Sequence, residues 1–127
     1  MTRIVICGGP RTGKTTMAAR MSLGATADVR HSDDLIATHD WSAASQHIAD
    51  EWLDDRHGPW IIEGVAMSRA LRKWREAHPY DEVPVDRVIR LVTPLVALSK
   101  GQETMAKGEE RVWSEIEGWL GRIVEWA

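Results

Sequence analysis

The stretch Gly8-Gly9-Pro10-Arg11-Thr12-Gly13-Lys14-Thr15 decides how the rest of the chain is interpreted. It has the form G-x-x-x-x-G-K-[ST], the phosphate-binding loop known as a P-loop. An apolar, β-prone run at residues 3–7 precedes it, and a helix-prone run at residues 15–21 follows it. A strand, a glycine-rich loop and a helix are the setting that this motif requires. The spacing therefore predicts a P-loop at the first turn from strand to helix.

The residue types in this loop suit a polyphosphate. Gly8 and Gly13 lack a Cβ atom, so the backbone N–H groups can point inward, and these donors together with the positive end of the following helix favour a polyphosphate. We expect Lys14 to contact the β- and γ-phosphates of ATP and the Thr15 hydroxyl to bind Mg²⁺. The alternative, a glycine turn that binds nothing, does not require Lys-Thr at this offset. The predicted ATP site comprises Gly8, Gly9, Pro10, Arg11, Thr12, Gly13, Lys14, Thr15 and Thr16.

The composition indicates one soluble globular domain over residues 1–127. Hydrophobic residues make up 43% of the chain and charged residues 28%, which is ordinary for this class. No apolar run approaches ~18 residues and no signal-peptide core is recognisable, so we expect a cytoplasmic chain (in the host cytoplasm if it is viral) with no membrane partner. A single cysteine, Cys7, excludes an internal disulfide, and a net charge of −3 gives no general attraction to nucleic acid.

Strand and helix patterns alternate along the chain. We expect further strands at 27–31, 60–64 and 87–92, and helices ending at Gly24 and covering 42–56 (with Asp40 or Ser42 near its cap), 67–77 and 109–126. The polar segment 95–107 is expected to form a short lid. This alternation predicts an α/β protein with the P-loop NTPase fold, a compact parallel sheet of about four strands with helices on both faces.

Acidic residues lie at the ends of two of the predicted strands, at the edge where the P-loop would lie. We expect Asp33 to act as the general base on an attacking hydroxyl, Asp34 to help bind the substrate, and Glu63 to support Mg²⁺ together with Thr15. Two alternatives remain open. Ser32 or Asp33 could cap a helical turn instead, and Glu63 could be an acid at a strand end that faces solvent.

Basic residues supply the remaining candidates. Arg69 is the basic residue of the 67–77 helix nearest to this edge, and we expect it to bind an acceptor phosphate. The lid and its flank would supply positive charge from three further residues. We expect Lys100 to bind the substrate, and Lys107 and Arg111 to take part in catalysis. Charges on such segments also occur as an ordinary solvated face. The five histidines show no metal-ligand spacing and are expected at the surface.

The motifs resemble those of two families of P-loop kinases. The first strand, the P-loop and Asp33-Asp34 look like the kinase domain of phage polynucleotide kinase, in which the first Asp of the pair is the general base. The segment Ile61-Ile62-Glu63-Gly64, with Arg69, is similar to the apolar-apolar-Asp-Gly-x-x-Arg segment of adenylate-kinase-like nucleotide kinases, with Glu in place of Asp. Compact phage kinases that phosphorylate hydroxymethylated bases in DNA also look similar. The chain is shorter than the members of the first two families, and we expect it to lack their fifth strand.

Together these patterns predict a kinase that transfers the γ-phosphoryl group of ATP to a hydroxyl of a nucleotide or nucleic acid, such as a polynucleotide 5′-hydroxyl or a hydroxymethylated base. ATP and Mg²⁺ are the expected cofactors. A nucleoside monophosphate kinase is the alternative enzyme. A nucleotide-binding ATPase or switch is the alternative outside the kinases.

Overall fold

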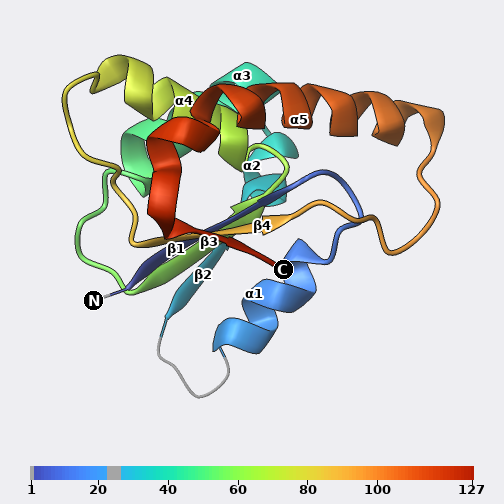
Figure 1. Ribbon diagram of the computed structural model, residues 1–127, viewed down its shortest axis with the longest axis horizontal. Coiled ribbons are helices and arrows are strands. Elements are labelled where there is room, and N and C mark those ends of the chain that lie inside the picture. Colours follow the sequence, from blue (N-terminus) through green and yellow to red (C-terminus); the bar gives the residue numbers. More distant parts are fainter. Residues whose placement is uncertain (1, 23–26) are drawn as a thin grey trace.

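A single parallel sheet forms the centre of the computed structural model, which describes residues 2–22 and 27–127. The described strands follow the order β2-β3-β1-β4-β5, and every neighbouring pair is parallel (Figure 1). Their bounds are Arg3–Gly8 (β1), Asp28–His31 (β2), Trp60–Gly64 (β3), Arg87–Leu91 (β4) and Val124–Trp126 (β5). The predicted α/β class with a parallel sheet is confirmed, and this arrangement is compatible with a Rossmann-like or a P-loop fold.

The prediction of about four strands was wrong, because β5 adds a fifth. The expected last helix ran to Trp126, but the helix ends at Leu120, and Gly121 adopts a φ of 58° there. A short 3₁₀ turn, η2 (Gly121–Ile123), then leads the chain back to the sheet. Val124 pairs with Val88 of β4, so the fifth strand that the sequence appeared to lack is supplied by the last described residues.

Helices cover both faces of the sheet. Their bounds are Lys14–Ser22 (α1), Ser32–Ile36 (α2), Trp41–His47 (α3), Ile48–Trp52 (η1, a π-helix), Met67–Ala77 (α4) and Lys100–Leu120 (α5). On one face Ala18 of α1 packs with Ile4 and Ile6 of β1. On the other face, the larger core contains Trp74 of α4 and Trp113 of α5 (Figure 1). None of the helices in the described part of the chain is long and apolar enough to cross a membrane.

Two predicted helices have different bounds in the structure. The 42–56 helix is α3 followed directly by η1, and the expected cap is confirmed because the Asp40 carboxylate accepts a 2.7 Å hydrogen bond from the Ala43 N–H. The 109–126 helix instead begins at Lys100, where Ser99 and Gln102 form a capping box. Most of the segment predicted as a lid is therefore the start of α5. The expected stop of the first helix at Gly24 lies outside the described residues.

Candidate functional site

The glycine-rich loop joins β1 to α1 at the carboxyl edge of the sheet. Gly13 has a φ of 89° and Arg11 a φ of 63°, so the backbone turns sharply in the left-handed region before the helix begins. Gly8 lies so close to β4 that a Cβ atom there would be 2.4 Å from the Leu91 carbonyl oxygen. The loop is thus held against the sheet, and its conformation depends on glycine at these positions.

Lys14 is buried at the start of α1, with 8% of its surface exposed. Its Nζ donates to the Gly9 carbonyl oxygen at 2.6 Å and to Thr12 Oγ1 at 3.4 Å. Burial lowers the pKa of Lys14, while the negative charges of Glu63 and Asp33 act in the opposite direction. The ammonium group is folded back onto its own loop and partly desolvated, which favours exchange of these contacts for an anion.

Glu63 is the next-to-last residue of β3, opposite Ile6 of β1, and only 2% of it is exposed. Its Oε1 accepts a hydrogen bond from Thr15 Oγ1 at 3.3 Å and lies 2.9 Å from His31 Nδ1. The alternative of a solvent-facing acid was therefore wrong. His31, which we expected at the surface, is a partly buried partner of this carboxylate.

Thr15 and Glu63 are suitable ligands for Mg²⁺. This ion prefers oxygen donors, and protein sites commonly supply one or two of them while phosphates and waters complete the shell. Within residues 2–22 and 27–127 there is no cluster of three or more His, Cys, Asp and Glu side chains that could hold a metal ion without such help. The donor set fits a magnesium ion that arrives with a nucleotide.

Asp33 lies in the first turn of α2, facing the glycine-rich loop across a cavity. The cap of α2 is His31, which makes no side-chain capping bond, so the alternative of Ser32 or Asp33 as the cap was wrong. Ser32 is buried instead under Gly64. Asp34 is exposed and does not line this cavity.

A cavity with a volume of about 530 Å³ is lined by half of the predicted site residues, among them most of the loop. The loop and α1 line it together with the end of β3, with residues of α2 and α3, and with the first turns of α5. Its lining residues are Pro10, Arg11, Gly13, Lys14, Thr15, Thr16, Asp33, Ile36, Trp41, Glu63, Val65, Gln102 and Met105. We call it the loop cavity.

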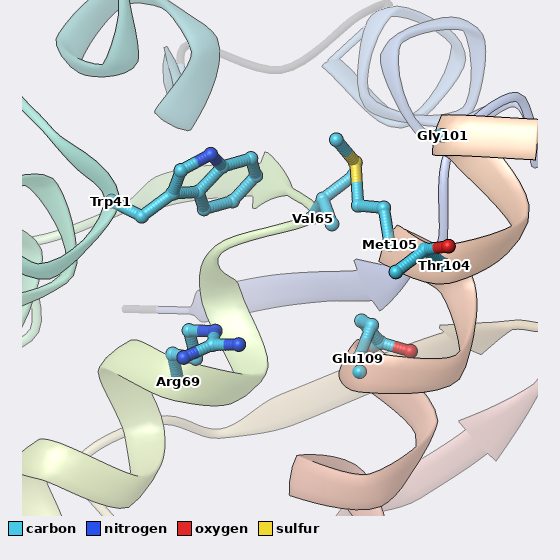
Figure 2. A pocket seen from close by; sticks show the side chains of 8 residues that line it. Trp41, Val65, Arg69, Gly101, Thr104, Met105 and Glu109 are labelled. Carbon is cyan, nitrogen blue, oxygen red and sulfur yellow. The ribbon is translucent and has the colours of Figure 1, made fainter.

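A second cavity of about 370 Å³ lies beside the loop cavity (Figure 2). The two share Trp41, Val65 and Met105, so they adjoin. Its lining residues are Trp41, Val65, Arg69, Gly101, Thr104, Met105, Gly108 and Glu109. We call it the side cavity, and Arg69 is the predicted site residue that it contains.

The other predicted basic residues are not brought to either cavity. Lys100, Lys107 and Arg111 are exposed on α5 and line neither. Spacings of seven and four residues place these three on one face of the helix, whereas Gly101, Thr104/Met105 and Gly108 lie on another. Their predicted contact with a nucleotide stays a prediction that would require movement of α5.

Arg90 and Glu109 form a buried network that sequence reasoning missed. The Arg90 guanidinium is 1% exposed and bonds Glu109 Oε2 at 2.5 Å and Glu110 Oε2 at 2.6 Å. It also lies 4.4 Å from the centroid of the Trp113 ring, a cation–π contact. A charged residue inside the apolar run 87–91 was the available signal, since a buried arginine requires partners.

Comparison with protein-family models and with curated proteins finds no match to this chain.

Proposed function

We propose that this chain is an ATP-dependent kinase of the P-loop NTPase fold, which transfers the γ-phosphoryl group to a hydroxyl of a nucleotide or nucleic acid. One observation carries the proposal. Lys14, Thr15, Glu63 and Asp33, which come from three separate elements, line a single cavity at the carboxyl edge of the parallel sheet. A turn without function would have no need to bring an ammonium, a hydroxyl and two carboxylates together there.

In this proposal the loop binds the triphosphate of ATP. Backbone N–H groups of the loop and the start of α1 favour the phosphate charge. Lys14 exchanges its contact with the Gly9 carbonyl, now 2.6 Å, for phosphate oxygens. Thr15 and Glu63 would hold Mg²⁺, which neutralises phosphate charge when it is bound.

Asp33 is placed to orient the acceptor hydroxyl and take its proton. The acceptor oxygen forms a bond to the γ-phosphorus while the bond between that phosphorus and the β,γ-bridging oxygen breaks, so ADP leaves with the electron pair. The hydroxyl proton passes to the Asp33 carboxylate. Catalysis of this kind depends mainly on positioning and on charge stabilisation, and a positioned base contributes typically ~10²–10⁴-fold.

The test is transfer from labelled ATP to a panel of acceptors by wild type and by Asp33→Asn. The panel contains nucleosides, nucleotides, DNA with a 5′-hydroxyl and DNA with hydroxymethylated bases. We expect transfer to a hydroxyl, with kcat lowered ~10²–10⁴-fold in Asp33→Asn and ATP affinity nearly unchanged. Asp81→Asn, which alters an exposed carboxylate in the loop after α4, is the matched control.

Each other outcome points to a different assignment. A folded Asp33→Asn protein with wild-type kcat and rate-limiting chemistry would favour a nucleoside monophosphate kinase, because a phosphate acceptor is already anionic. Loss of Mg²⁺–ATP binding would assign Asp33 to the metal. ATP hydrolysis that no acceptor stimulates would favour an ATPase or switch.

A further inference from the structure

The side cavity is suited in size and position to hold the acceptor of the proposed reaction. Its volume of about 370 Å³ falls at the small end of the ~300–1,000 Å³ range of small-molecule sites. It adjoins the loop cavity through Trp41, Val65 and Met105, so a group protruding from it would point toward the proposed phosphate site. The chemistry of its lining residues determines what it would bind.

The larger part of the lining is apolar. Figure 2 shows the Trp41 indole on one side of the cavity, with Met105 of α5 across from it and Val65 between them. An indole face and a thioether favour contact with a planar aromatic ring. Stacking on such a platform tolerates any nucleobase, because every base has a π-face.

The charged groups of the side cavity are one acceptor, Glu109, and one donor, Arg69. Glu109 is buried, with 4% of its surface exposed, and its Oε2 accepts from Ser68 and Arg90 at 2.5 Å each. Within the described residues no donor bonds its Oε1. Arg69, on α4, brings its Nη2 to 3.8 Å from the position that a Cβ atom would take at Gly108 of α5, and no ion pair or hydrogen bond joins its guanidinium to the described residues (Figure 2). By contrast, Glu115 engages Arg72 and Arg75, the other arginines of α4.

From these contacts we propose that the side cavity binds one unpaired nucleobase of the acceptor, stacked on Trp41. An N–H at the edge of the base donates to Glu109, and a neighbouring carbonyl or ring nitrogen accepts from Arg69. Nucleobase edges present such donor and acceptor pairs. The assignment rests on the proposed kinase function, which it deepens by naming the group that the enzyme recognises.

A base that is paired within a duplex does not fit this proposed site. A base within a duplex has its pairing edge occupied and both faces stacked, so it would have to leave the helix to enter. A free nucleoside and an unpaired base in a strand present the same chemistry. The two sources differ only in what continues outside the cavity, and binding measurements on both separate them.

The experiment measures binding without transfer, by calorimetry of the full chain with a non-hydrolysable ATP analogue and Mg²⁺. The probes are the four deoxynucleosides, a single-stranded and a duplex oligonucleotide of the preferred base, and the analogue of that nucleoside methylated at its edge N–H. We expect binding of the nucleoside or the single strand, weaker binding of the duplex, and at least ~10-fold weaker binding of the methylated analogue.

Three variants test the residues. Trp41→Leu should weaken binding roughly 10- to 100-fold while Trp41→Phe keeps most of it. Arg69→Met should weaken binding at least ~10-fold, and Glu109→Gln should reduce the discrimination against the methylated analogue. If Glu109→Gln fails to fold because it disrupts the Arg90 pair, the Trp41 and Arg69 variants still decide. Tyr80→Leu, at a residue 98% exposed in the loop that follows α4, is the matched aromatic control.

Failure of this inference differs from failure of the kinase proposal. Unchanged affinity in Trp41→Leu, or equal binding of the methylated analogue, would overturn the base site even if phosphoryl transfer is found. Base binding that depends on Trp41, in a protein that transfers no phosphoryl group, would keep the base site and reject the kinase.

Discussion

Among glycine-to-alanine substitutions in the described part of the chain, Gly64→Ala should be the most destabilising. It should disturb the junction between β3 and α2. A Cβ atom at Gly64 would lie 1.6 Å from Ser32 Oγ and 2.6 Å from Ser32 Cβ. Gly64 also has a φ of 151°, a conformation that residues with a side chain rarely adopt. Ser32 is fully buried, so it has little space to retreat.

The expected magnitude follows from two contributions. Holding alanine at this φ costs about 1–3 kcal/mol. Forcing a methyl group into a packed site costs about 1–3 kcal/mol more. We therefore expect Gly64→Ala to lower the free energy of unfolding by about 2–6 kcal/mol, a large part of the ~5–15 kcal/mol typical of a domain. Because Ser32 precedes Asp33, the proposed transfer activity should fall as well.

Urea unfolding followed by tryptophan fluorescence measures the effect. Ser32→Gly removes both clashing atoms, so the double variant should recover part of the loss, and the coupling between the two sites gives the steric share. Gly118→Ala is the control: no atom lies within 4 Å of its added Cβ, and its place inside α5 predicts a gain of about 0.5–1 kcal/mol. A loss below about 1 kcal/mol in Gly64→Ala would refute the reasoning.

Three further predictions concern the loop, α5 and the thiol. Burial lowers the pKa of Lys14 below its usual 10.5, and bound phosphate favours the charged form, so ATP affinity should fall as pH rises in the range below 10.5. The unliganded chain should instead gain stability as pH rises in this range, because its unfolded state binds more protons than its folded state. Calorimetry and urea titrations at several pH values check both signs, and a flat affinity profile would contradict the role of Lys14. If residues 95–107 close over the nucleotide, their amides should exchange more slowly with a saturating non-hydrolysable ATP analogue, and unchanged rates would argue against a lid. Burial and Glu109 raise the pKa of Cys7 to about 12, so native protein should resist alkylation at neutral pH and react only after unfolding, as mass spectrometry would show.

The sequence was most informative where a local pattern determines the structure. The bounds of β3 and α4 were predicted as the structure has them, because a continuous apolar run ended by Glu63-Gly64 and a one-sided apolar helix before Pro79 are local signals. The glycine-rich motif likewise located the loop cavity. Asp33 comes shortly after β2 and Glu63 lies near the end of β3, and because these strands lie side by side, the topology of a parallel sheet was enough to bring them near the loop.

Other features depended on contacts between distant segments. β5 has three residues, and only its pairing with β4 makes it a strand. The buried position of Glu109 depends on hydrogen bonds from Arg90 and Ser68, which lie far from it in sequence. The early start of α5 was different, because Ser99 followed three residues later by Gln102 was a local capping signal that Gly101 and Gly108 obscured.

The continuity of α5 has a mechanical consequence. It is a single helix of 21 residues, about 31 Å long at 1.5 Å per residue, and it contributes Gln102 to the loop cavity and Glu109 to the side cavity. Arg90 fastens the helix to β4 near its middle. If the first turns of α5 tilt as a rigid body about the Arg90–Glu109 ion pair, both cavities change shape together. By thermodynamic reciprocity, any tilt that occupation of one cavity favours would change the affinity of the other, and each ligand would alter the binding of its neighbour by the same factor.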